Sequence, residues 1–171
     1  MYLIATFPSL HINIDKYPAI KNHLLSFGIE RLEQTGKTHK INGVEIKSRK
    51  KTNNKWFETQ DSIAYWDDFP KQKIIYSETN NSADTKICLD NEGYYTDKTC
   101  FIITSNKNLD LLYKCMSSPV FTWYMALISP LLGNSGISLT KDSVELFPAV
   151  NNADIKQSYH LTDEEWTYIC K

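Results

Sequence analysis

The stretch RKKTNNKWFETQDSIAYWDDFPKQKIIYS, residues 49–77, carries the most unusual chemistry of this chain. It begins with three consecutive cations, continues through amides into Trp56 and Phe57, and then mixes polar and aromatic side chains as far as Trp66. A segment that only builds a core would not combine charges, amides and aromatic rings in this way. A surface that contacts phosphates with cations and base edges with amides and carboxylates has this composition. We therefore interpret the rest of the chain as the scaffold that holds this stretch.

The composition is that of a folded domain of ordinary size. The chain has 171 residues, of which 42% are hydrophobic and 23% charged, and both fractions are close to globular averages. This length is sufficient for one domain with its own core. The composition therefore excludes wholesale disorder.

The net charge of −1 hides a strong local asymmetry. Residues 37–55 hold seven Lys or Arg side chains and one acid, Glu45, so this segment carries +6 and the remainder −7. Binding to an anionic polymer depends on the local field more than on the total charge. Two interpretations of the basic segment stay open: contact with DNA, and a solvated loop without a partner.

The cysteines and the N-terminal residues favour a cytoplasmic protein. The four cysteines form no C-x-x-C pair and have no histidine at metal-ligand spacing, so neither a zinc site nor a disulfide framework is indicated. The apolar N-terminal stretch, residues 1–10, lacks a basic leader and a cleavage site. No window approaches about 18 consecutive apolar residues, so we expect no membrane partner.

Periodicity and turn signals predict the elements of the first third of the chain. Residues 1–7 and 10–14 are expected to be strands, and residues 15–34 a helix that Gly28 interrupts and Gly36 ends. Residues 39–50 are expected to form a hairpin around Asn42-Gly43, the preferred dipeptide of a type I′ turn.

The remaining residues predict further strands and helices. Strands are expected at residues 73–77, 85–90, 93–97 and 99–104, and helices at residues 108–115 and 118–129. A Gly-rich loop follows, and Thr162 with Glu165 has the spacing of a capping box. The predicted fold class is α+β, one mixed domain of twisted sheet elements with a few packed helices. We expect the domain at residues 1–150, and at residues 151–171 a linker with the start of a helix from a longer parent.

Catalytic signatures are weak. Glu45-Ile46-Lys47 matches the E-x-K element of metal-dependent nucleases, but such a site needs a further carboxylate nearby, and a charged hairpin strand explains the pattern better. No glycine-rich phosphate cradle, G-x-S-x-G or H-E-x-x-H occurs, and the histidines are dispersed. We therefore predict that this chain alone is not an enzyme, and assign no catalytic or metal-binding residue.

Several separated motifs carry a resemblance to a known family. They are TFPSL, KYPAIKNHLLSFG, the 49–76 stretch with K-W-F-E, Q-D-S-I-A-Y and K-I-I-Y, then GYYTDKTCFIIT, and SPVFTWYMALISPLLGNSGISLTKDSVELFPAV. Their order over residues 3–150 resembles the TaqI-like C-terminal specificity domain. This domain is the target recognition domain of single-chain restriction–modification enzymes that methylate adenine N6.

The resemblance implies a mixed α+β domain that recognises a short sequence in double-stranded DNA. It also implies a methyltransferase domain of the parent chain as partner, often with a fused endonuclease. This chain lacks the N-P-P-Y motif that holds a flipped adenine, and it lacks a glycine-rich S-adenosylmethionine site. Methyl transfer is therefore expected in the parent, with S-adenosylmethionine, and with Mg²⁺ where a nuclease is present. No cofactor is expected in this fragment.

The candidate DNA-binding residues lie in two stretches: Lys47, Arg49, Lys50, Lys51, Asn53, Asn54, Lys55, Gln60 and Asp61, and then Ser135 and Ser138. The lysines are candidates for phosphate contact, with an idle surface role as the alternative. The amides and Asp61 are candidates for base edges, since amides pair with adenine and carboxylates accept from cytosine N4. Gln60 and Asp61 belong to the recurring motif, so a structural role is the alternative for them. The two serines are candidates for phosphate contact, and Trp56 and Tyr65 are expected in the core.

A second class of function stays open. The aromatic residues between Trp56 and Trp66 could dock a partner protein instead. Salt dependence separates the two hypotheses, because DNA binding releases counterions and weakens steeply as salt rises.

Overall fold

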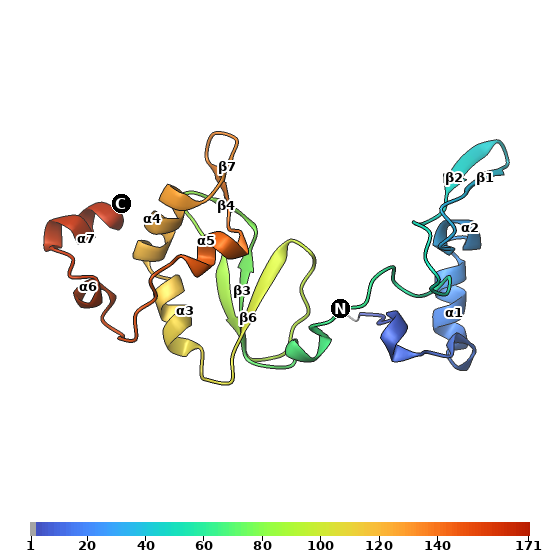
Figure 1. The fold of residues 1–171 in the computed structure, drawn as a ribbon, viewed down its shortest axis with the longest axis horizontal. Helices are drawn as coiled ribbons and strands as arrows, with labels where there is room; N and C mark the ends of the chain where they lie inside the picture. The colour runs from blue at the N-terminus through green and yellow to red at the C-terminus, as the bar shows by residue number, and fades with distance from the viewer. Residues whose placement is uncertain (1–2) are drawn as a thin grey trace. The chain divides into compact units, whose positions relative to one another are not determined.

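The computed structural model describes residues 3–171 and divides them into two compact units, residues 3–64 and 65–171 (Figure 1). Both units combine helices with antiparallel strands, so the predicted α+β class is confirmed. Within residues 3–171 no helix is long and apolar enough to cross a membrane.

The first unit contains short helices and one hairpin. Its elements are the 3-10 turns η1 (Pro8–Leu10) and η2 (Ile14–Lys16), helices α1 (Pro18–Leu25) and α2 (Ile29–Leu32), and strands β1 (Thr38–Ile41) and β2 (Val44–Lys47). Pro18 occupies the first turn of α1, where its missing N–H has no consequence. Gly28, at φ 89°, separates the two helices. Asn42 and Gly43, at φ 51° and 82°, make the predicted hairpin turn, so the broken helix and the hairpin are both confirmed.

The strands predicted at residues 1–7 and 10–14 are wrong where the structure describes them. Met1 and Tyr2 lie outside the described residues, residues 3–7 have no regular structure, and of residues 10–14 only Leu10, in η1, and Ile14, in η2, belong to an element. The alternation of Leu10, Ile12 and Ile14 predicted a half-buried strand, but within the described residues no neighbouring strand pairs with it. Pro8 cannot donate to a ladder, and it begins the 3-10 turn instead.

The second unit is built on a three-stranded antiparallel sheet of order β5-β3-β6. Its strands are β3 (Lys73–Ser77), β5 (Ile87–Asp90) and β6 (Cys100–Thr104), after the 3-10 turn η3 (Trp66–Asp68). Three of the predicted strands are therefore confirmed, within two residues at their ends. The strand predicted at residues 93–97 is wrong, because these residues form a loop. The N–H of Tyr94 donates to the side chain of Asp90 instead of to a neighbouring strand.

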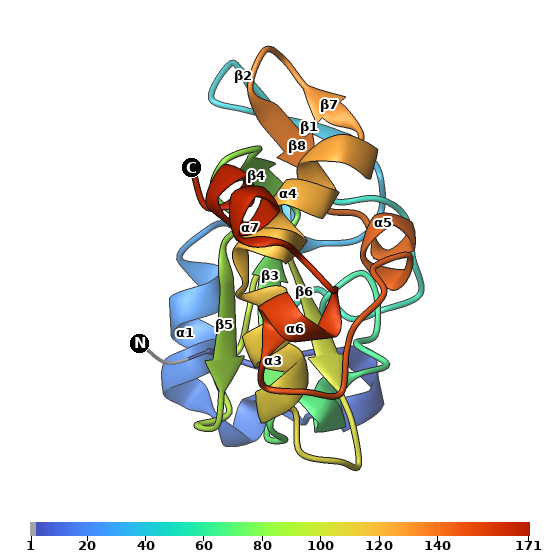
Figure 2. The same cartoon turned by 90° about the vertical axis from the view of Figure 1, so that its left-hand side faces the viewer.

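Helices cover one face of this sheet. They are α3 (Asp110–Met116), α4 (Pro119–Ile128), α5 (Lys141–Glu145), α6 (Ile155–Ser158) and α7 (Asp163–Ile169). In Figure 1, α3 and α4 lie to one side of β3 and β6, and Figure 2, seen from that side, shows α3 in front of the sheet. Ile74 and Tyr76 of β3 project toward the helices and are buried with Cys115, Phe121 and Met125. Because strand side chains alternate, the same face takes every second residue of β3.

A smaller sheet and side-chain caps on the helices complete this unit. The sheet has the order β4-β8-β7, from β4 (Thr79–Asn81), β7 (Leu131–Leu132) and β8 (Gly136–Ser138). Ser118 caps α4, and Thr162 with Glu165 forms the predicted capping box of α7. The helix predicted at residues 108–115 is α3, whose ends differ from the prediction by one or two residues. Leu109 is its N-cap, and the side chain of Asn108 accepts from the N–H of Asp110.

Residues 151–171 contribute to the core of the second unit. The sequence predicted a linker here, and the structure adds α6, whose Ile155 is buried in the core cluster. Trp166 and Ile169 of α7 pack against the same cluster. The assignment of residues 1–150 as one domain stays a prediction.

An ion pair is buried at the start of the central strand. Lys73 is 0% exposed, and its Nζ donates to Asp90 and to the carbonyl of Phe69. Asp90 also accepts from the N–H groups of Glu92 and Tyr94, at 2.8 and 2.9 Å. Burial alone would raise the pKa of Asp90, but the Lys73 ammonium and these N–H groups together hold it below its usual range. The pair thus joins β3, β5 and the loop after β5.

We expect Asp90→Ala to reduce the free energy of unfolding by about 3–5 kcal/mol, because it leaves the Lys73 ammonium buried without its carboxylate. Asp68→Ala is the matched control, since it removes the exposed Lys71–Asp68 pair at 2.6 Å and should cost less than about 1 kcal/mol. Urea unfolding measures both variants. Equal losses would contradict the structural role of the buried pair.

Candidate nucleic-acid interface

The two units differ in charge. Residues 1–64 hold ten Lys or Arg and six Asp or Glu, a formal charge of +4, whereas residues 65–171 hold nine and fourteen, a charge of −5. The field around a charged patch, more than the net charge, governs attraction of an anionic polymer. The first unit is therefore the one whose charge suits DNA.

The predicted site residues divide between the two units. Nine of them lie at residues 47–61 of the first unit, whereas Ser135 and Ser138 lie in the second unit. Ser135 is exposed in the turn between β7 and β8, and its carbonyl accepts from the N–H of Ser82 at 2.9 Å. Ser138 is only 9% exposed within β8, so of the two it presents far less surface to a ligand.

The hairpin presents one polar face. Thr38 is paired with Lys47, and Lys40 with Glu45, and all four side chains are exposed. Lys47 is therefore accessible, as predicted for a phosphate contact, while Glu45 lies opposite a cation. Within residues 3–171 no group of three or more His, Cys, Asp or Glu side chains is placed to hold a metal ion.

Glu33 fixes the base of the hairpin to the end of α2. Its Oε1 accepts from the Thr35 hydroxyl at 2.9 Å and lies 2.5 Å from Nε2 of His39 in β1. The Thr35 hydroxyl is also 2.9 Å from that of Ser48, just after β2. The hydroxyl of Thr35 and then the ring of His39 lower the pKa of Glu33 from its ordinary value of 4.5. The Glu33 carboxylate thus contacts β1 directly, and the residue after β2 through the Thr35 hydroxyl.

Arg49 is bound to the backbone of its own unit. Its guanidinium donates to three carbonyls, those of Leu32 at 2.7 Å, Glu58 at 2.8 Å and Trp56 at 2.5 Å. Burial lowers the pKa of Arg49, although a guanidinium stays charged in proteins. With three of its five N–H donors used inside the unit, Arg49 is placed to hold the chain after it, residues 50–61.

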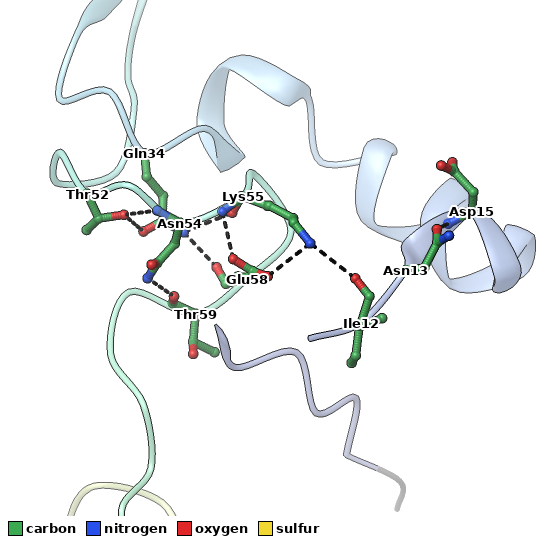
Figure 3. A network of polar contacts seen from close by, with 9 residues as sticks. All are labelled: Ile12, Asn13, Asp15, Gln34, Thr52, Asn54, Lys55, Glu58 and Thr59. Carbon is green, nitrogen blue, oxygen red and sulfur yellow. Dashed lines mark hydrogen bonds and ion pairs between the residues drawn. The ribbon is translucent and has the colours of Figure 1, made fainter. Parts of the chain in front are cut away.

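The buried polar side chains of Gln34 and Glu58 organise residues 49–61, which we call the 49–61 loop (Figure 3). Gln34 is 5% exposed, donates to the carbonyls of Lys55 and Glu58, and accepts from the Thr52 hydroxyl at 2.7 Å. Glu58 is 6% exposed and accepts from the N–H of Lys55 at 2.7 Å. No local pattern in the sequence indicates this role of Gln34, because its partners lie 18 to 24 positions away.

Asn54 and Lys55 also make contacts inside the unit. The Asn54 amide donates to the carbonyls of Thr59 and Gln60 at 3.0 and 2.9 Å. The Lys55 ammonium lies 3.7 Å from Glu58 Oε1 and donates to the carbonyl of Ile12 at 3.4 Å (Figure 3). Both residues therefore help to hold the loop in shape.

The loop leaves a small set of polar side chains exposed. Lys50, Lys51, Asn53 and Asp61 are exposed, and in the part of the chain that the structure describes their side chains form no hydrogen bond or ion pair. Gln60 is half-buried. The structure thus brings two cations, an amide and a carboxylate together on one rigidly held loop.

The aromatic residues of the stretch have different surroundings. Trp56 is half-buried and its ring contacts that of buried Phe57, with centroids 5.5 Å apart. Tyr65 is 53% exposed, so its expected place in the core is wrong. Tyr65 lies at the first residue of the second unit and contacts the ring of Phe69. Trp56 and Tyr65 therefore do not form one patch within a single unit.

A basic unit with a fixed loop of free cations and an amide is the architecture of a nucleic-acid recognition module. Comparison with family models agrees with this class: residues 13–149 match the TaqI-like C-terminal specificity domain. The chain belongs to this family, which confirms the resemblance seen in its motifs. Neither the comparison with curated proteins nor that with solved structures gives a match.

We expect Arg49→Ala to reduce the hydrogen-exchange protection of the 49–61 loop by about 2–3 kcal/mol, because it leaves three carbonyls without their charged donor. The amides of Thr52 and Lys55, which bond within this network, are the ones to follow. Lys50→Ala removes the next, exposed cation and should change protection by no more than about 0.5 kcal/mol. Similar effects of the two changes would contradict the role given to Arg49.

The pKa of Glu33 predicts a pH dependence of the hairpin base. A carboxyl group whose pKa is lowered by folding stabilises the fold above its unfolded pKa and loses this effect as pH falls through its folded pKa. Between about pH 6 and pH 3, the urea midpoint for loss of the hairpin amide signals should fall, and in Glu33→Gln it should fall less. An equal fall of the urea midpoint in both proteins would show that Glu33 does not contribute to this pH dependence.

Proposed function

We propose that this chain is the DNA-sequence recognition domain of a restriction–modification protein. The parent protein in this proposal is a site-specific adenine-N6 DNA methyltransferase of a type II system. Membership of a family of specificity domains supports recognition of double-stranded DNA as the role of the chain. The adenine target and the enzyme type come from the resemblance and are part of the proposal. A parent of this kind acts on the DNA of its own cell, in the cytoplasm.

The structural observation that supports the proposal is the set of exposed polar side chains on the 49–61 loop. In the basic unit, Lys50, Lys51 and Asn53 are exposed, and among residues 3–171 their side chains have no hydrogen-bond or ion-pair partner. They lie on a loop whose backbone is held by Arg49 and buried Gln34. Free cations position a protein on the phosphates, and a free amide discriminates between base edges. A fixed backbone under them reduces the entropy lost on binding. This combination suits sequence recognition better than it suits catalysis.

Catalysis belongs to the parent protein in this proposal. S-adenosylmethionine would supply the methyl group there, and Mg²⁺ would serve an endonuclease if the parent carries one. The methyltransferase part of the parent is the expected protein partner of this chain. In this proposal Lys50, Lys51 and Asn53 bind and orient DNA and take no part in methyl transfer.

An exposed aromatic cluster supports a second candidate function, docking of a partner protein. In the second unit, Trp66 stacks on Tyr95 with ring centroids 4.7 Å apart, and Tyr65 and Tyr94 beside them in sequence are exposed. Aromatic residues are enriched at protein interfaces. Binding through this cluster would depend little on salt and would show no preference for duplex DNA.

We expect Lys50→Ala with Lys51→Ala to weaken binding of the 171-residue chain to every duplex alike. The slope of log K against log salt concentration should become shallower by about 1.8, or 0.9 for each lost phosphate contact. Lys107→Ala with Lys114→Ala, two exposed lysines of the acidic unit, is the matched control and should leave the slope unchanged. Fluorescence anisotropy on labelled duplex over a range of salt measures the slopes. Duplex binding that does not respond to salt would refute the proposal.

A further inference from the structure

Two adjacent asparagines of the 49–61 loop have opposite surroundings. The Asn54 side chain donates to two carbonyls of the same loop, those of Thr59 and Gln60. The Asn53 side chain is exposed and forms no hydrogen bond within residues 3–171. From the sequence alone the two amides are equivalent candidates for a base contact. In the structure only that of Asn53 has no hydrogen bond within residues 3–171 and is exposed to a ligand.

Both neighbours of Asn53 are held in place. The N–H of Thr52 donates to the Gln34 carbonyl at 3.1 Å, and the Thr52 hydroxyl donates to Oε1 of the same residue. The N–H of Asn54 donates back to the Thr52 hydroxyl at 3.0 Å. The backbone of Asn53 is thus anchored on each side while its amide stays free to meet a ligand.

We propose that Asn53 is the specificity-determining residue of the 49–61 loop, that it pairs with an adenine in the major groove, and that Gln34 and Glu58 position it. The inference rests on the proposed function and deepens it. An asparagine amide offers one donor and one acceptor at the spacing of adenine N7 and N6, and this pairing distinguishes adenine from the other bases. The Asn54 side chain has no free donor for such a pair, since its amide N–H groups already donate to two carbonyls.

The same network gives Lys55 a role different from that of its neighbours. Its ammonium lies near the buried Glu58 carboxylate and donates to the carbonyl of Ile12, so it ties the loop to the N-terminal segment of the unit (Figure 3). Lys50 and Lys51 have no such partner in the described chain. The phosphate contacts of the loop therefore come from Lys50 and Lys51, and Lys55 is a positioning residue.

Selection of bound duplexes from a randomised library tests the role of Asn53. The wild-type chain should enrich a short sequence containing adenine. Asn53→Ala should lose preference at one base pair by about 5- to 100-fold, the range of one bidentate contact, with an unchanged salt slope. Asn22→Ala removes an exposed amide of the same unit, in α1 and outside the loop, and is the matched control; it should keep the wild-type preference. Because Asn53 is exposed and unbonded, its substitution should leave loop hydrogen exchange unchanged.

Salt dependence tests the role of Lys55. Lys51→Ala should make the slope shallower by about 0.9, and Lys55→Ala should not. Glu58→Gln keeps an oxygen that accepts from the Lys55 N–H but removes the negative charge beside the ammonium. It should free Lys55 to meet a phosphate and make the slope steeper by up to about 0.9.

The outcomes separate the inference from the proposed function. A wild-type chain that binds no duplex, or binds without enriching any sequence, overturns both. Enrichment of a sequence that Asn53→Ala retains in full overturns the inference and leaves the proposed function standing. A slope that Lys55→Ala reduces as much as Lys51→Ala does overturns the role assigned to Lys55. Lost preference in Asn53→Ala, with Lys55→Ala unchanged in slope, supports the inference.

Discussion

The guanidinium of Arg49 is the contact on which the candidate interface depends. It lies at the end of the hairpin and binds the carbonyls of Leu32, Trp56 and Glu58, which come from different parts of the chain. A loop of this kind has few backbone partners of its own, and buried carbonyls without donors are costly. Arg49 satisfies several of them with one rigid, always charged group. The loop can therefore hold one shape with little apolar burial to stabilise it.

Both units use the same device, a buried charge that fixes a loop. In the first unit Glu58 and Gln34 hold the backbone that carries Asn53, and in the second the Lys73–Asp90 pair holds the loop that carries Tyr94. Such groups contribute little net stability compared with apolar side chains of similar volume, because their desolvation is costly. They do discriminate strongly between one loop conformation and its alternatives, since a half-satisfied network is unfavourable. A recognition surface needs that discrimination, because base contacts require defined geometry.

Local signals in the sequence predicted local structure well. The turn at Asn42-Gly43, the break at Gly28 and the capping box of Thr162 with Glu165 each depend on backbone chemistry within a few residues. The predictions failed where a longer-range partner decides the outcome. The alternation of Leu10, Ile12 and Ile14 fits a strand, but a strand also needs a neighbour, and periodicity carries no information about one. The motifs that resemble the family identified it correctly, because their order along the chain is itself the signal.

The sequence by itself determined the α+β class, the family, and the segment in which free cations and amides are concentrated. Only the tertiary structure decided which of those side chains have partners within their own unit. Arg49, Asn54 and Lys55 are polar residues of the same segment as Lys50, Lys51 and Asn53, and no local pattern separates the two sets. For Arg49 and Lys55 the separation arises because Leu32 and Ile12, 17 and 43 positions away, place carbonyl groups beside their side chains. The Asn54 amide is held by the carbonyls of Thr59 and Gln60, which the shape of the loop brings near. A hydrogen bond depends on distance in space, and for partners outside a regular helix or strand only the tertiary structure sets that distance.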